Sequence, residues 1–283
     1  MADRPRLVGT RHAVEEPIRG IVSDRASGAR VEVNRCAPSE ALDDVVAYYW
    51  SGRWDFAEGE GHTTLMLSDP SVNFVFERAG SQAGSRVVGV WTKLWERTLE
   101  GRGFVRGAKL HPGALRAFTG TAAHELSNRI VELSHVFGRE IGGLERAVLE
   151  PEDDGAGFGA IEEWLSAGRR RSDQEPISLA VAIVRRITRD PEITTVQRLA
   201  DVAGLSRRHL QRLFRDHVGA SPKWVIRRNR LQEVAARLES GEAPNLARLA
   251  AELGYTDQAH LSHDFRNAVG RSPSAFRPAA PGD

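Results

Sequence analysis

The stretch Leu199-Ala-Asp-Val-Ala-Gly204-Leu-Ser-Arg-Arg-His-Leu210-Gln-Arg-Leu-Phe-Arg215 recurs along the chain as Leu249-Ala-Ala-Glu-Leu-Gly254-Tyr-Thr-Asp-Gln-Ala-His260-Leu-Ser-His-Asp-Phe-Arg266. Both copies continue into Val-Gly-x-Ser-Pro, beginning at Val218 and Val269. Matched residues are 50 apart up to the glycine and 51 apart after it, so the second copy holds one extra residue just past its turn. The repeat predicts two copies of a short apolar helix, a glycine turn and a second helix.

The second helix of the first copy has two distinct faces. Ser206 can cap it, Gly204 supplies the positive φ of the preceding turn, and Leu205, Leu210, Leu213, Phe214 and Val218 form a stripe that should face the core. The opposite stripe holds Arg207, Arg208, Gln211, Arg212 and Arg215. Arginine can bridge two acceptors of guanine and glutamine can pair with adenine, so this stripe is suited to reading bases in a major groove. A solvated basic helix face is the alternative.

The second copy is less basic. Leu261, Phe265 and Val269 should point inward, and Asp257, Gln258, Ser262, His263 and Arg266 should point outward. His260 and His263 have a spacing seen in metal sites, but no third ligand lies at an obvious spacing, so we predict no metal. Between the copies, Arg227, Arg228 and Arg230 could contact phosphate or pair with Glu233, Glu239 or Glu242.

These residues resemble the DNA-binding domain of the AraC/XylS family of bacterial transcription regulators, over roughly residues 178–278. The resemblance implies seven helices, arranged as two helix-turn-helix units joined by a long helix over about 221–238. By position it implies base contacts at Arg208, Gln211, Arg212, Gln258, Ala259 and His263. Positions 259 and 263 depart from the polar or arginine side chains that some members use there. The second unit is therefore expected to contribute less to base reading.

Composition indicates an ordinary globular chain. The sequence has 283 residues, of which 41% are hydrophobic and 27% charged, and no apolar stretch is as long as a membrane span. The single cysteine, Cys36, excludes an internal disulfide framework. Residues 178–283 have 17 Arg and Lys against 11 Asp and Glu, a net charge of +6, whereas the rest has 22 against 27, a net of −5. We therefore expect a cytoplasmic protein whose C-terminal part meets a polyanion.

The N-terminal part combines strand and helix signals. Short β-branched or aromatic runs predict strands at 30–33, 63–67, 72–76, 87–91 and 104–110, and helical patterns occur at 42–50, 114–118, 141–149 and 158–165. We expect an α+β fold. The N-terminal domain should be a small sheet or half-barrel with helices, and the C-terminal domain should be all-α. The predicted division is 1–166, a charged linker at 167–177, and 178–283.

Local signals also set helix boundaries in the C-terminal part. Ser178 is expected to begin a helix through Ile187, and Thr194 with Gln197 forms a capping box for the next one. Ser221-Pro222 predicts the start of the long helix, and Ser272-Pro273 the start of a final short one. The second repeat should begin near Asn245.

The N-terminal part is similar, more loosely, to the sensor-like α+β domains found ahead of this module in many family members. That likeness implies effector sensing or dimerisation. The residues that could line an aromatic effector pocket are Trp50, Trp54, Met66, Trp91, Trp95 and His111. Ordinary packing in the core of the sheet is the alternative for each of them.

The functional expectation is a sequence-specific DNA-binding regulator, an activator, modulated by a small molecule through its N-terminal domain. The expected DNA-binding residues are Ser206, Arg207, Arg208, Gln211, Arg212, Arg215, Gln258, His263 and Arg266. Expected partners are double-stranded DNA, RNA polymerase, a small-molecule effector and a second copy of the chain, with no cofactor and no membrane. Two alternatives stay open: a DNA-repair methyltransferase-like enzyme using Cys36, and a ligand-binding or scaffold protein with degenerate DNA binding.

Overall fold

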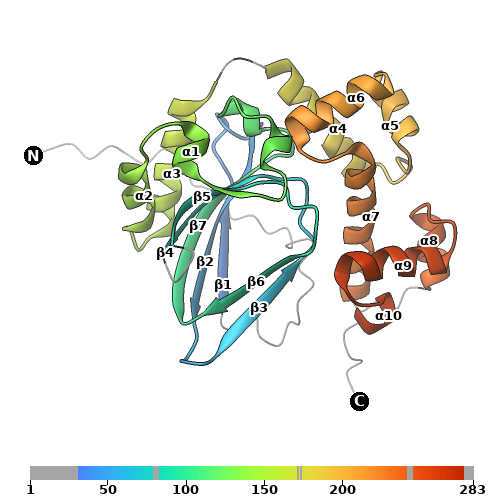
Figure 1. The fold of residues 1–283 in the computed structure, drawn as a ribbon, viewed down its shortest axis with the longest axis horizontal. Coiled ribbons are helices and arrows are strands. Elements are labelled where there is room, and N and C mark those ends of the chain that lie inside the picture. The colour runs from blue at the N-terminus through green and yellow to red at the C-terminus, as the bar shows by residue number, and fades with distance from the viewer. Residues whose placement is uncertain (1–30, 79–82, 171, 173, 241–244, 277–283) are drawn as a thin grey trace, which may run out of the picture.

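The computed structural model describes residues 31–78, 83–170, 172, 174–240 and 245–276, and it places a sheet-based N-terminal part beside a helical C-terminal part (Figure 1). Within the described residues, six antiparallel strands form one sheet in the order β1-β2-β7-β4-β5-β8, and β3 pairs with β6 in a separate ribbon. The strands are β1 (Val31–Cys36), β2 (Val46–Asp55), β3 (Gly61–Met66), β4 (Asn73–Arg78), β5 (Gly84–Val88), β6 (Trp95–Glu100), β7 (Arg102–Leu110) and β8 (Ile130–Glu132). The mixed α+β fold is confirmed.

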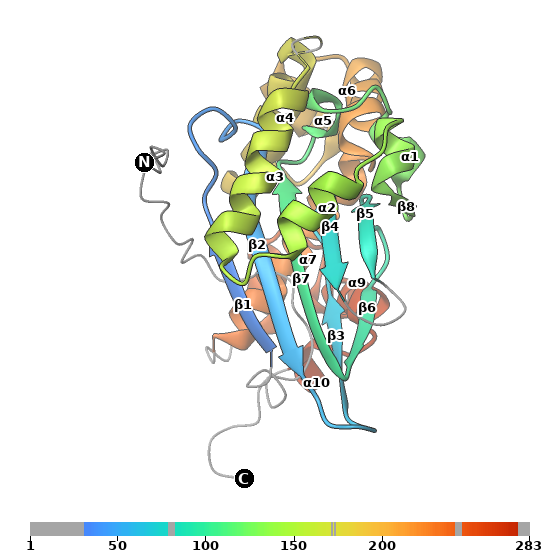
Figure 2. The same cartoon turned by 90° about the vertical axis from the view of Figure 1, so that its left-hand side faces the viewer.

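The two faces of the large sheet pack against different elements. Helices α2 (Gly142–Leu149) and α3 (Asp154–Gly168) cover one face, next to the short α1 (Leu133–Phe137) (Figure 2). On that side Tyr49 stacks on Phe158, with ring centroids 5.9 Å apart. On the other side Trp54 and Val105 pack with Leu99 of β6. The sheet is therefore buried between helices and the β3–β6 ribbon.

The predicted helix at 42–50 is wrong. Residues 40–45 form a turn, and β2 then runs from Val46 to Asp55 between β1 and β7. Leu42, Val45, Val46 and Tyr49 are all fully buried, and their spacing imitates one face of a helix. The imitation arises because the turn is followed by a register shift between Val46 and Tyr48, which puts Val46 and Tyr49 on the same side of the strand.

Other predicted elements and their boundaries also differ from the structure. The sequence patterns missed β6 and β8, and the helix predicted at 114–118 is a single 3₁₀ turn, Leu115–Ala117. Helix α4 (Gln174–Arg189) begins four residues before Ser178, so the last residues of the predicted linker are helical. The cap of α5 (Val196–Ala203) is Thr195 and not Thr194, because the Thr195 hydroxyl accepts the Arg198 N–H. Arg30, at the start of the first predicted strand, lies outside the described residues.

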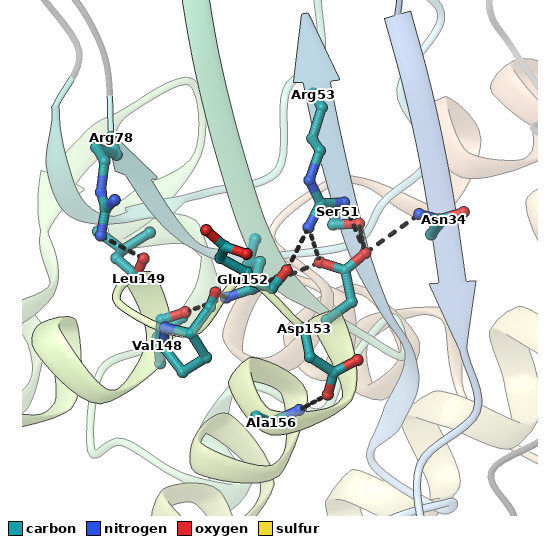
Figure 3. Close-up of polar contacts among 12 residues, drawn as sticks. Asn34, Ser51, Arg53, Arg78, Val148, Leu149, Glu152, Asp153 and Ala156 are labelled. Carbon is teal, nitrogen blue, oxygen red and sulfur yellow. Dashed lines mark hydrogen bonds and ion pairs between the residues drawn. The ribbon is translucent and has the colours of Figure 1, made fainter.

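A polar network fastens the start of α3 to the sheet. The Asp154 carboxylate accepts hydrogen bonds from Asn34, Ser51 and Arg53, three residues of β1 and β2 that converge on this point (Figure 3). It also accepts one from Arg106 of β7, whose side chain is completely buried. Burial alone would raise the pKa of Asp154, but these hydrogen bonds outweigh it and hold that pKa well below its usual range. We expect this network to matter for stability.

The described residues of the C-terminal part form the expected seven α-helices. They are α4, α5, α6 (Arg207–Leu213), α7 (Pro222–Glu239), α8 (Leu246–Glu252), α9 (Gln258–Val269) and α10 (Pro273–Phe276). Helices α5 and α6 form the first unit, α8 and α9 the second, and α7 joins them (Figure 1). Gly204 and Gly254 both have positive φ, +64° and +68°, as the repeat requires. Asn245 caps α8, and the predicted caps Ser206 and Ser221 are confirmed.

The two parts share one apolar core. A continuous buried cluster runs from Tyr49 and Phe74 in the sheet region to Leu199, Phe214 and Val225 in the helical region. A second cluster joins Leu67, which follows β3, to α7, α8 and α9. Among the described residues, no helix is both long and apolar enough to cross a membrane.

Candidate nucleic-acid interface

Helix α6 separates its apolar and basic side chains as the sequence predicts. The Ser206 hydroxyl accepts the His209 N–H at 3.2 Å and begins the helix. Leu210 and Leu213 are buried, and so is the following π-helical turn at Phe214 and Val218. The side chains exposed on the other face are Arg207, Arg208, Gln211, Arg212 and Arg215.

The basic face of α6 is open to ligand. Within the part of the chain that the structure describes, no carboxylate forms an ion pair with Arg207, Arg208 or Arg212. Arg215 lies nearer the N-terminal part, with Nη2 3.4 Å from Nε2 of His124. The three exposed arginines can thus contact an anion or a base edge without first breaking an ion pair.

Helix α9 presents a smaller and less basic face. Asp257 begins it by accepting the His260 N–H at 2.7 Å. Gln258, Ala259, His263 and Arg266 are exposed, whereas Ser262 is half-buried. His263 Nε2 lies 2.9 Å from Asn267 Nδ2 on the same helix. With one arginine on its outer face, α9 has less capacity than α6 for bidentate contacts.

Among the described residues, Arg227, Arg228 and Arg230 of α7 bind other groups than Glu233. Arg227 forms a two-pronged ion pair with Asp264 of α9, with both N–O distances 3.0 Å. Arg228 is 4% exposed and donates to the Thr92 carbonyl, and Arg230 donates to the Thr194 carbonyl. Glu233 instead accepts from Arg237, and Glu242 lies outside the described residues. The three arginines thus make contacts within the fold, and their contact with phosphate stays a prediction.

The N-terminal part contacts α7 along one side of that helix. Trp224, Arg228 and Gln232, spaced four residues apart, donate to main-chain carbonyls of the N-terminal part: the first two to Thr92 and the third to Leu67. The Arg228 guanidinium also lies 4.8 Å from the centre of the Trp224 ring. Burial and the neighbouring Arg227 lower the pKa of Arg228 to about 10. None of these contacts was visible in the sequence patterns.

The six residues proposed for an effector pocket lie in three places. Trp50 and Trp54 pack with the core between the sheet and the β3–β6 ribbon. Met66 is paired in register with Trp95, whose ring lies edge-on to Trp91 with centroids 4.8 Å apart. His111 lies at the junction with α4, where Arg185 donates to its Nε2 at 2.8 Å. The structure does not bring the six together as the wall of one pocket.

His111 gives the domain junction a dependence on pH. Burial, with a smaller effect from Arg185, lowers the pKa of His111 to about 4, so the folded protein holds it neutral. Between about pH 4 and pH 6.5 the unfolded chain binds a proton that the folded chain does not, so stability falls as the pH falls through this window. The free energy of unfolding should therefore fall less between pH 7 and pH 4.5 in His111→Gln than in the wild type, by on the order of 2 kcal/mol. Urea unfolding at pH 7 and pH 4.5 measures these free energies. Equal decreases in the variant and the wild type would contradict the prediction.

Two families match the chain. Residues 199–279, which span both helix-turn-helix units, match a family described as "Helix-turn-helix domain". Residues 34–132 match one described as "Domain of unknown function (DUF6597)". An uncharacterized HTH-type transcriptional regulator of Haemophilus influenzae is 37% identical over 82 residues, which are 29% of this chain and 27% of that protein. A putative AraC-like transcription regulator of Streptomyces antibioticus is 37% identical over 90 residues, 31% of this chain and 29% of that one.

The C-terminal part of the chain is therefore similar to AraC-type transcription regulators. Among solved structures, the C-terminal domain of AraT, a response regulator from Geobacillus stearothermophilus, is 25% identical and covers 36% of this chain and 91% of that one, with a TM-score of 0.31. The chain spans less than half the length of the curated relatives it matches. The match to these regulators covers the two helix-turn-helix units, and the N-terminal part is matched by a family without an assigned function.

Cys36, the residue on which an enzymatic alternative depends, lies at the end of β1. It is half-buried and packs against the main apolar core. Its Sγ lies 3.5 Å from the Ala37 carbonyl oxygen. A methyl-accepting thiol has to be activated as a thiolate, and this apolar contact surface does not favour one.

Proposed function

We propose that this protein is a sequence-specific DNA-binding transcription regulator that reads two successive major-groove segments. The observation that carries the proposal is the exposed stripe of Arg208, Gln211 and Arg212 on the second helix of an AraC-type unit. Arginine and glutamine are the side chains that pair bidentately with guanine and adenine. We include further DNA contacts on both units: Ser206 at the cap of α6, Arg207 on α6, Arg215 in the π-helical turn after it, and Gln258, His263 and Arg266 on α9.

The length of α7 supports binding by both units at once. Its 18 residues make a helix about 27 Å long. Successive major-groove segments on one face of DNA recur at roughly 34 Å. The two units can therefore be separated by a distance of the right order. Binding through both would follow from the fold without a second copy of the chain.

Selection of bound fragments from random duplex DNA by the full-length protein tests the proposal. We expect a recovered site with two short preferred segments about one helical turn apart, and binding that weakens steeply with salt. A Cys36→Ser variant should bind the same site. Failure of the full-length chain to enrich any sequence at low salt would refute the proposal, and loss of binding in Cys36→Ser would favour the enzymatic alternative.

We further propose that the N-terminal domain regulates DNA binding, either by taking up a small, partly apolar molecule or by holding two chains together. The contacts of Trp224, Arg228 and Gln232 support this role, since they attach the N-terminal part to the helix between the two units. An effector can act only by binding one arrangement of these parts better than another. Activation through RNA polymerase, in the cytoplasm where the DNA lies, belongs to the same proposal. The test is to measure the affinity of the full-length protein for the selected DNA site, and its molecular mass, with and without metabolite mixtures. No change in either quantity would refute the proposed regulatory role.

The second unit should contribute less base preference than the first. We expect His263→Ala to reduce discrimination between the selected site and its point variants by less than about threefold, because His263 is exposed and already bonded to Asn267. Competition binding with variant duplexes measures this. A loss as large as that caused by Arg212→Ala would overturn the ranking of the two units.

A further inference from the structure

The two helix-turn-helix units touch each other beside α7. Gly254, the turn glycine of the second unit, lies against Thr194, which precedes the first helix of the first unit. A Cβ on Gly254 would be 2.6 Å from Thr194 Cγ2, and the backbone φ is +68°. A side chain at position 254 would force the units apart, so glycine is required both by the turn and by the close approach.

Arg230 of α7 binds both sides of this contact. Its Nη2 donates to the Thr194 carbonyl at 2.5 Å, and its Nη1 lies 3.5 Å from the Gly254 carbonyl oxygen. Its guanidinium lies 5.3 Å from the ring centre of Tyr255, which follows the turn glycine and is buried. One side chain thus contacts the start of the first unit and the turn of the second.

Neighbouring residues of α7 contact α4 and the second unit separately. Asn229 donates to the Ile187 carbonyl of α4 at 3.2 Å, and Arg227 pairs with Asp264 of α9. The first contact attaches α4, which precedes the first unit, and the second attaches the second unit, whereas Arg230 contacts both the start of the first unit and the turn of the second. We therefore expect the angle between the two units to depend on Arg230 more than on Asn229 or Arg227.

We propose that Arg230 is a positioning residue that fixes the angle between the two units and so sets the spacing of the two DNA segments that the protein accepts. This inference rests on the proposed function. One added base pair moves the second segment by about 3.4 Å and turns it by about 35° around the DNA axis. A rigid pair of units cannot follow that displacement, but a loosened pair can.

Binding to the selected DNA site, with and without one base pair inserted between its two segments, tests the proposal on the full-length chain. We expect the insertion to weaken wild-type binding by at least about tenfold, and binding of Arg230→Met by less than about threefold. Arg230→Lys, which keeps the charge but can reach one carbonyl at a time, should fall between them. The matched control is Arg186→Met, because Arg186 pairs with Asp190 on its own helix. An insertion penalty in Arg230→Met equal to that of the wild type would overturn the inference.

A measurement without DNA separates this inference from the proposed function. Spin labels at Arg198→Cys and Asn267→Cys, both exposed, report the distance between the units in a Cys36→Ser background. We expect one narrow distance distribution in the otherwise unchanged chain and in Arg186→Met, and a broader one in Arg230→Met. Equal widths would overturn the inference whether or not the protein binds DNA. Failure of the wild type to bind any duplex would refute the proposed function, and a broadened Arg230→Met distribution would still support the positioning of the units.

Discussion

Replacing Arg212 with alanine is expected to reduce discrimination between the preferred DNA site and its point variants by about 5- to 150-fold. This range corresponds to the roughly 1–3 kcal/mol that a bidentate arginine–guanine contact contributes. Arg212 is exposed beside Gln211 on the outer stripe of α6, and in the described residues no ion pair occupies it. Gln211→Ala should show a loss in the same range at a different base pair.

The measurement is competition binding against a panel of duplexes that differ at single positions. Arg248→Ala serves as a matched control, because Arg248 is an exposed arginine on α8, paired with Glu252 of the same helix. Arg248→Ala should weaken binding to all duplexes equally or not at all. If Arg212→Ala also weakened every sequence equally, Arg212 would contact phosphate and the assignment of a base-reading face would be wrong.

Local chemistry was enough to predict the helices and turns of the two helix-turn-helix units. Glycine at the turn, serine at the helix start and proline in the first turn each restrict the backbone wherever they occur, and Gly204, Ser206, Ser221 and Pro222 adopt the expected roles. The basic stripe of α6 could be predicted for the same reason, since the spacing of Leu210 and Leu213 determines which side chains face away from the core.

Partners that are distant in sequence could not be predicted. Arg227, Arg228 and Arg230 have glutamates nearby on their own helix, yet their partners are Asp264, Thr92 and Thr194, which only tertiary packing brings within reach. The spacing of Leu42, Val45 and Val46 matched a helix as well as a turn followed by a strand, because the shift in β2 preserves the helical pattern of burial. The proposed aromatic pocket relied on residue type alone, and His111 lies at the domain junction and not with the tryptophans.

Asp154→Ala is expected to destabilise the folded chain by about 3–5 kcal/mol, the usual cost of removing one partner from a buried charge pair. The variant leaves the completely buried Arg106 guanidinium without its carboxylate partner, and its remaining described hydrogen-bond acceptors are the uncharged carbonyls of Val148, Pro151 and Glu152. It also removes the acceptor that joins Arg53 and Ser51 to the start of α3. Without it, the helix layer loses its main polar attachment to the sheet.

The difference in unfolding free energy between wild type and variant, from urea titrations followed by circular dichroism, measures this effect. Asp55→Ala is the control, because the Asp55 side chain is 75% exposed and lies 3.9 Å from Arg102, so its loss should cost less than about 1 kcal/mol. The pKa of Asp154 is lowered on folding, so its contribution is present above the ordinary aspartate pKa of 3.8 and is lost as the pH falls below it. The difference between wild type and Asp154→Ala should therefore shrink below about pH 4. A loss at pH 7 no larger than that of Asp55→Ala would show that the network contributes little and that packing of α3 against Tyr49 and Phe74 holds the helix layer in place.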